Sequence, residues 1–104
     1  MSDGGESDAE QRFVALSEEV AGQGVPMMAA MLLVAAHMGI SADSRSFARI
    51  FGVEHALVLR ELVAMEAEMR LVTITRRDER SQRLHFTPTD QGEAFLAHAV
   101  ARET

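Results

Sequence analysis

The sequence predicts a mostly helical domain that contains one β-hairpin. Over most of the chain, apolar residues recur three and four positions apart, which is the spacing of one face of an α-helix. Within residues 71–92 the pattern changes to two short runs in which apolar and polar residues alternate, as in strands with one buried face. The chain has 104 residues, of which 47% are apolar, and this suffices for one domain with one modest core.

The chain begins with nine small, polar and acidic residues, MSDGGESDA. Such a composition cannot bury enough apolar surface to fold, so we expect a flexible acidic tail over residues 1–9 and a folded domain over residues 10–104. No signal peptide is recognisable, and the longest apolar run, residues 25–38, is too short to span a bilayer. We therefore expect a cytoplasmic protein.

Two helices are predicted in the first third of the chain. The first starts at about residue 10 and carries its apolar face on Phe13, Leu16 and Val20. The second, residues 26–38, has a proline in its first turn and contains no charged residue. Because a helix that is apolar on all sides is buried on all sides, the second helix is expected at the centre of the domain.

Two further helices follow in close succession. Ser41 and Asp43 both suit the N-cap of a third helix that ends at Gly52, and a fourth helix covers residues 54–69. Two helices joined by a tight glycine turn and followed by a hairpin make a winged helix-turn-helix, in the order helix-helix-helix-helix-strand-strand-helix. The inward-facing residues of the third helix are expected to be Phe47, Ile50 and Phe51.

The hairpin carries a concentration of arginine. Leu71 and Ile74 mark its first strand, Leu84 and Phe86 mark its second, and residues 76–82 form the predicted loop. Four arginines within eight residues favour phosphate contact over a solvated tip in which arginines and acids pair with one another. These arginines are Arg76, Arg77, Arg80 and Arg83.

The charge of the chain is unevenly distributed. The net charge of −6 argues against indiscriminate binding to nucleic acid. Residues 70–87, however, hold five arginines against two acids. A basic hairpin on an acidic body suits docking in one orientation better than a general electrostatic attraction.

The outer face of the fourth helix leaves two interpretations open. In the first, Arg60, with His55 at the start of the helix, reads base edges, while Arg45 and Arg49 on the preceding helix hold phosphates. In the second, the face is solvated or binds a protein, because it also presents two carboxylates and a leucine. The other residues of that face are Leu57, Glu61, Ala64 and Glu68.

Nothing in the sequence predicts an enzyme, a metal site or a cofactor. There is no cysteine, the four histidines lack metal-site spacing, and no nucleophile accompanies the paired acids. His37 is expected to be a hydrogen-bonded core or interface residue. A cluster of methionines either lines a small-molecule pocket or forms core, and core is the commoner role. Its members are Met27, Met28, Met31 and Met38.

Residues 28–96 resemble the winged helix-turn-helix of the multiple-antibiotic-resistance regulator (MarR) family. Residues 47–53, FARIFGV, are similar to the first helix of that motif, and Val58, Leu62 and Met65 to core positions of its recognition helix. Residues 77–80, RDER, followed by Leu84, Phe86-Thr87 and Thr89-x-x-Gly92, resemble its wing. The chain departs from the pattern at Met69-Arg70, where the family has a glycine.

The resemblance implies a dimeric regulator of transcription whose recognition helix enters the major groove of DNA and whose wing grips the minor groove or backbone. A last helix is predicted over residues 94–102, with Thr89 as its cap. We expect a homodimer held by the first helix and this last helix. The residues expected there are Phe13, Leu16, Val20, Phe95, Leu96 and Val100. The alternative is a winged-helix protein-interaction module that binds another regulator through the acidic and apolar face of its fourth helix.

Overall fold

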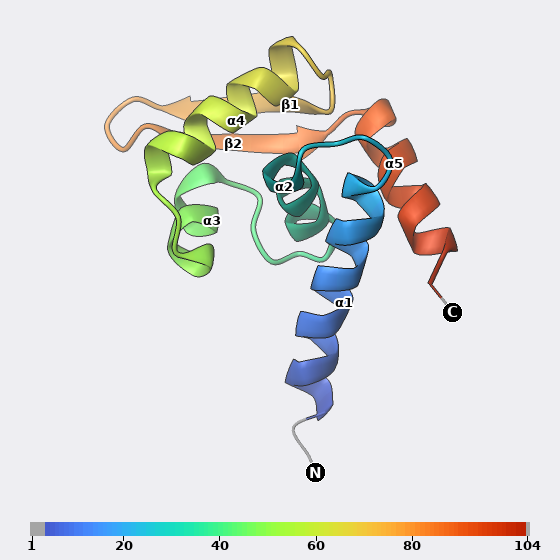
Figure 1. Cartoon of the computed structure of the whole chain (residues 1–104). Helices are drawn as coiled ribbons and strands as arrows, with labels where there is room; N and C mark the ends of the chain where they lie inside the picture. Colours follow the sequence, from blue (N-terminus) through green and yellow to red (C-terminus); the bar gives the residue numbers. More distant parts are fainter. Residues whose placement is uncertain (1–3, 104) are drawn as a thin grey trace.

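The computed structural model describes the backbone of residues 4–103 and the side chains of residues 8–103. It confirms a mostly helical chain with one antiparallel hairpin, arranged as shown in Figure 1. This order of elements is compatible with a winged helix. The elements are α1 (Gly4–Ala21), α2 (Met27–His37), α3 (Ser44–Phe51), α4 (His55–Ala67), β1 (Val72–Asp78), β2 (Arg83–Pro88) and α5 (Asp90–Ala101).

Helix α2 lies at the centre of the fold, as its uncharged sequence predicts. Helices α1, α4 and α5 and strand β2 all contact it. Of the seven residues of α2 from Ala29 to Ala35, six are buried and the seventh, Met31, is half-buried. Burial is not complete on every side, because Met27 is exposed at the start of the helix and His37 at its end. The expectation that His37 lies in the core is therefore wrong.

Helix α1 begins earlier than the sequence suggests. Its first residue is Gly4, so residues 4–9 of the predicted flexible tail are helical, whereas residues 1–3 lie outside the described part of the chain. The helix packs on α2 and α5 and buries Phe13, Leu16 and Val20, and the Phe13 ring stacks on that of Phe51 in α3 with ring centroids 4.9 Å apart. The terminal helices thus cover α2 within one chain.

Helix α3 has a well-defined start and end. The Asp43 carboxylate accepts a hydrogen bond from the Ser46 backbone N–H at 2.9 Å, so Asp43 rather than Ser41 is the N-cap. Gly52 ends the helix in the left-handed conformation, with φ of 67°. Phe47 is buried, but Ile50 is 49% exposed, contrary to the prediction. The buried face is centred on Ser44 and Phe47, and Ile50 lies to one side of it.

The hairpin is longer and its loop shorter than the sequence suggests. Strand β1 continues to Asp78, so Arg76 and Arg77 belong to the strand and the turn contains only residues 79–82. Asp78 Oδ1 accepts the N–H of Arg80 at 3.0 Å, and this hydrogen bond stabilises the turn. The pairing register shifts between Ile74 and Arg76, which marks a β-bulge.

A short segment before α3 joins the other edge of β2. Asp43 forms an isolated antiparallel bridge with His85, and the Phe86 N–H donates to the Ala42 carbonyl at 3.2 Å. These bonds fix the start of α3 against the hairpin. No feature of the sequence pattern indicated this pairing.

The base of the hairpin is fastened to α5. The Thr89 hydroxyl donates to the Arg70 carbonyl at 2.7 Å and accepts the N–H of Gly92 at 3.1 Å, which makes Thr89 the N-cap, as predicted. Helix α5 starts at Asp90, not Ala94, so Gly92 lies in its first turn. A Cβ atom on Gly92 would overlap the carbonyl oxygen of Leu71, and this close approach explains why the position holds glycine.

No helix in the described range, residues 4–103, combines the length and the apolarity that crossing a membrane requires.

Candidate nucleic-acid interface

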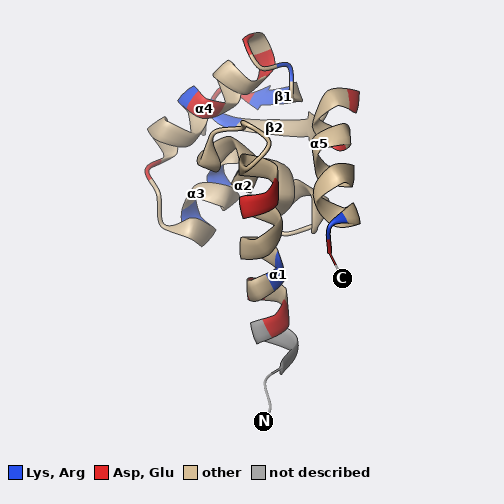
Figure 2. Ribbon diagram, turned by 45° about the vertical axis from the view of Figure 1, so that its right-hand side comes forward, with Lys and Arg blue, Asp and Glu red and all other residues tan. Residues whose placement is uncertain are grey.

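Three of the residues predicted to contact DNA line one hollow between α3 and α4. Arg45 and Arg49 lie one helical turn apart on α3, so their side chains share a face of that helix. The turn at Gly52 reverses the chain and brings His55, the first residue of α4, beside them. Ala48 and Val53 complete the hollow, whose volume is about 360 Å³. Figure 2 shows the two basic positions on α3.

Both arginines of the hollow are exposed to solvent. Arg45 Nε donates to the carbonyl of Ser81, in the hairpin turn, at 3.3 Å. This contact places the hairpin turn next to the start of α3, so a partner that reaches the hollow also reaches the turn. Two arginines with free guanidinium N–H groups and an imidazole are a favourable environment for a phosphate or carboxylate.

His55 is held by a buried serine. Ser44 Oγ lies 2.8 Å from His55 Nε2 and accepts the backbone N–H of Leu84 at 2.9 Å. Ser44 is completely buried. Its hydroxyl therefore ties the start of α3 to the start of α4 and to β2. Sequence reasoning missed Ser44, because a serine in the first turn of a helix is usually an ordinary capping residue.

The surroundings of His55 favour its neutral form. Partial burial, with the positive charges of Arg45 and Arg83, lowers the pKa of His55 below its ordinary value, and the negative charge of Asp43 opposes this only in part. A neutral ring presents one nitrogen as an acceptor. With Ser44 Oγ accepting from Leu84, the Ser44 O–H is free to donate to Nε2 of that neutral ring.

Arg83 is engaged within the protein. Its Nε is shielded from solvent and lies 3.4 Å from Asp43 Oδ1, an ion pair whose geometry falls short of a hydrogen bond. Burial acts to raise the pKa of Asp43, but hydrogen bonds from Ser46 and the charges of Arg83 and His85 outweigh it, so this pKa is lowered. Arg83 thus holds β2 to the α3 cap and is not free to contact a phosphate.

The remaining hairpin arginines do not form a single patch. Arg76 lies opposite His85 and Arg77 opposite Leu84, and consecutive strand residues point to opposite faces of the sheet. Arg80 lies in the turn, and all three side chains are exposed. One partner surface can therefore contact Arg80 together with Arg76 or Arg77, but not all four hairpin arginines as the predicted loop implied.

The outer face of α4 is mixed in character. Arg60 is exposed, but it lies about 140° around the helix from His55, since each residue turns an α-helix by about 100°. Leu57 is 43% exposed. Glu61 Oε2 is buried and has no hydrogen-bond partner among the described residues, and burial raises the pKa of its carboxyl group. Glu68 is exposed at the end of the helix.

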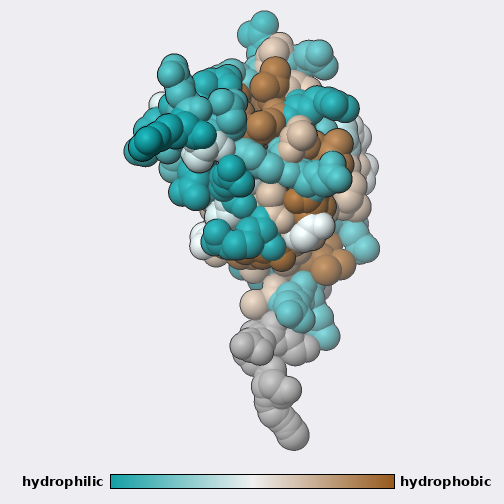
Figure 3. All heavy atoms as spheres, turned by 90° about the vertical axis from the view of Figure 1, so that its left-hand side faces the viewer, coloured by the Kyte–Doolittle hydropathy of each residue, from teal (hydrophilic) through white to brown (hydrophobic). Residues whose placement is uncertain are grey.

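The side of the molecule that carries the hairpin turn has both hydrophilic and hydrophobic surface. In Figure 3 hydrophilic side chains gather over one part of this face, and hydrophobic surface shows beside them and along the lower edge of the described part. Hydrophilic side chains therefore cover a part of this face and not the whole of it.

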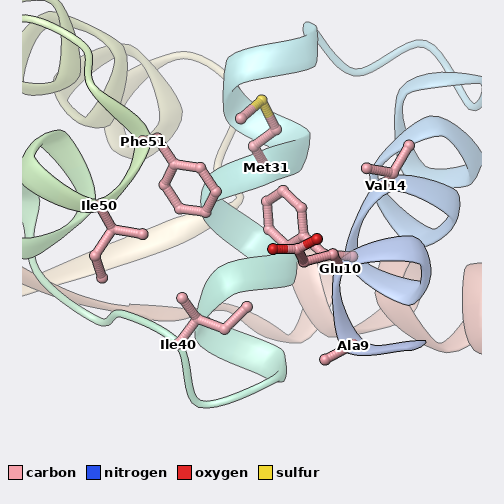
Figure 4. Close-up of a pocket in the computed structure, with 8 residues that line it drawn as sticks. Ala9, Glu10, Val14, Met31, Ile40, Ile50 and Phe51 are labelled. Atoms are coloured by element: carbon pink, nitrogen blue, oxygen red, sulfur yellow. The ribbon is translucent and has the colours of Figure 1, made fainter. Parts of the chain in front are cut away.

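A second hollow, which we call the apolar groove, lies between α1 and α3. It has a volume of about 640 Å³, and its lining residues point into a common space in Figure 4. Of the predicted methionine cluster only Met31 lines it, and Glu10 is the one charged residue among the described residues of its lining. The others are Ala9, Phe13, Val14, Ile40, Ile50 and Phe51.

Comparison with known proteins identified no relative: no protein-family model, no curated protein and no solved structure matches this chain.

Proposed function

We propose that this protein is a winged helix-turn-helix regulator of transcription that acts in the cytoplasm and binds double-stranded DNA as a homodimer. In this proposal α3 and α4 are the helix-turn-helix, α4 is the recognition helix and the hairpin is the wing. The observation that carries the proposal is the convergence of Arg45, Arg49 and His55 in one hollow, with the hairpin turn beside it. The arrangement offers the two cations of α3, with the hairpin turn beside them, to one backbone of a duplex.

The side chains have different roles in this proposal. Arg45 and Arg49 hold phosphates beside the recognition helix, and Arg80 holds a phosphate at the tip of the wing, with Arg76 or Arg77 along its edge. Arg60 is the base-reading candidate, because it is exposed on the outer face of α4. Arg83 positions the cap of α3, since it pairs with Asp43, and His55 lies in the hollow beside the two arginines with its Nε2 held by Ser44.

The test is a titration of labelled duplex DNA with the protein, followed by fluorescence anisotropy at two salt concentrations. The DNA just upstream of the protein's own coding sequence serves as the candidate operator, and a shuffled duplex of equal composition serves as the control. Tighter binding to the candidate operator supports a sequence-specific regulator. An absence of binding to either duplex at low salt contradicts the proposal.

A second candidate function, a protein-interaction module, is favoured by the chemistry of α4. Its outer face combines the exposed Leu57 with the carboxylates of Glu61 and Glu68, which phosphates would repel. A protein partner with an apolar and basic surface complements this face. Replacement of Leu57 by Glu would abolish capture of such a partner and would leave binding to non-specific DNA through Arg45 and Arg49 in place.

The homodimer needs a contact other than the one the sequence suggested. Phe13, Leu16, Val20 and Leu96 are already buried within one chain, and Phe95 and Val100 are half-buried. The apolar groove leaves Val14, Ile40 and Ile50 exposed, and burying this surface against a second copy would be favourable. We therefore place the contact between copies at the apolar groove.

A further inference from the structure

We infer that the hollow formed by Arg45, Arg49 and His55 is a phosphate subsite in which an incoming phosphate group is bound together with a proton on His55. The inference rests on the proposed function for the source of that phosphate, the DNA backbone. It goes further in making occupancy of the subsite dependent on pH. The imidazole of His55 shares one hollow with two exposed arginines.

The charged groups around His55 explain why its pKa is lowered when the subsite is empty. Arg45 from α3 and Arg83 from β2 are close enough to oppose a third positive charge, and Asp43 from the segment before α3 compensates for only part of their effect. Arg49 adds another cation to the same hollow. Glu54 precedes the ring in the chain, and its side chain forms no capping hydrogen bond with α4.

A phosphate in the hollow has the opposite effect on His55 and favours its protonation. Its negative charge offsets Arg45 and Arg49, and an anion beside an imidazole favours the protonated ring. The protonated ring adds a third cationic group to the subsite and so strengthens the binding of the anion. By linkage, if the phosphate raises the affinity of His55 for a proton, the proton raises the affinity of the subsite for phosphate by the same factor.

The hydrogen bonds of Ser44 can serve both states of the ring. With neutral His55 the hydroxyl accepts from Leu84 and donates to Nε2; with protonated His55 the direction of the second bond reverses, and Nε2–H donates to Ser44 Oγ. A hydroxyl oxygen has two acceptor positions, so it can accept from both partners at once. His55 therefore keeps its place while its charge changes, and the hollow does not have to rearrange.

The experiment is a pH titration of the four imidazole side chains by NMR, in inorganic phosphate and in sodium chloride of equal ionic strength. We expect phosphate to raise the pKa of His55 by about one unit and to leave that of His98, exposed on α5, unchanged. Arg49→Ala should remove most of the shift, whereas Arg102→Ala, at the far end of α5, should not. An equal pKa of His55 in the two salts would overturn the inference.

A calorimetric titration with duplex DNA separates this inference from the proposed function. Performed in two buffers of different ionisation enthalpy, it counts the protons taken up on binding. We expect an uptake of up to about half a proton per subunit near neutral pH in the native protein, the most that a pKa shift of one unit allows, and none in His55→Gln, with His98→Gln as the matched control. DNA binding without proton uptake contradicts the inference and leaves the proposed function standing. A phosphate-dependent pKa of His55 without any DNA binding supports the phosphate subsite and contradicts the proposed function.

Discussion

The hydroxyl of Ser44 lies 2.8 Å from Nε2 of His55, although eleven positions separate the two residues in the chain. The same oxygen accepts the N–H of Leu84, forty positions further along the chain from Ser44. One buried side chain thus joins α3 and α4, the two helices that line the basic hollow, to β2. The geometry of that hollow depends on this serine.

Replacement of Ser44 by Ala should therefore destabilise the protein. The substitution leaves the buried N–H of Leu84 without a partner, and an unsatisfied buried group costs about 1–3 kcal/mol. Ser17→Ala is the matched control, because Ser17 is also buried but its hydroxyl has no partner among the described residues. Urea denaturation should show a lower unfolding free energy for the first variant only. Equal losses in both would mean that the Ser44 network contributes nothing specific.

Gly92→Ala tests the junction between the hairpin and α5. The new Cβ would overlap the Leu71 carbonyl oxygen, which is backbone and cannot move independently, so we expect a loss of about 1–3 kcal/mol. Gln91→Ala, at the exposed neighbouring position in the same helical turn, should change the unfolding free energy little. Thermal unfolding of the two variants measures the difference. An unaltered melting temperature of Gly92→Ala would contradict the close packing.

Glu61→Gln should stabilise the protein at neutral pH. Burial raises the pKa of Glu61, so the folded state binds the proton more tightly than the unfolded state, and stability falls as pH rises through that pKa. The Glu61→Gln variant does not lose stability in this way as pH rises, because its side chain does not ionise. We expect its unfolding free energy to exceed that of the native protein at pH 7 and to match it at low pH, where Glu61 is protonated in both the folded and the unfolded state.

Glu68→Gln is the control for that comparison, because Glu68 is exposed and should show no such pH dependence. Chemical denaturation at several pH values compares the variants. A Glu61→Gln variant no more stable than the native protein at pH 7 would show that the carboxylate is solvated or paired in solution. In DNA titrations both substitutions should strengthen non-specific binding at low salt, because each removes a negative charge from the outer face of α4.

Light scattering tests the proposed homodimer. The chain has a mass of 11.4 kDa, and we expect about twice that mass at micromolar concentration. Ile50→Glu places a charge in the apolar groove without disturbing the core, since Ile50 is half exposed, and it should return the mass to that of one chain. Gln11→Glu adds the same charge on α1 outside the groove and should leave the dimer intact. A native protein of single-chain mass would contradict the homodimer.

Much of the helical part of the fold is predictable from local signals. The uncharged run in α2 and the glycine at position 52 are local features, each recognisable from a few residues of sequence. The structure agrees with the predictions made from both. Thr89 is the predicted cap of α5, although the helix starts four residues earlier than expected. The first-turn position of Gly92 could not be predicted, because it depends on the Leu71 carbonyl from another element.

The candidate site was only partly predictable, for a related reason. Arg45, Arg49 and His55 were expected to contact DNA, but their meeting in one hollow depends on the turn at Gly52 and on Ser44. The hairpin arginines looked like one cluster because sequence spacing does not show how far β1 extends. Because Arg76 and Arg77 are consecutive residues of a paired strand, their side chains point to opposite faces of the sheet. Pairing of Arg83 with Asp43 is a long-range contact that no local pattern indicates.

The most direct test of the account is the salt dependence of DNA binding in Arg45→Ala/Arg49→Ala. If both arginines hold phosphates, the slope of log affinity against log salt should become shallower by about 0.9 for each lost contact, with affinity falling on every duplex. Arg12→Ala/Arg102→Ala removes the same charge from two arginines that pair with Glu103 and Glu19, away from the hollow, and should keep the native slope. An unchanged slope in Arg45→Ala/Arg49→Ala, or an equal change in both double variants, would contradict the proposal that this hollow binds DNA.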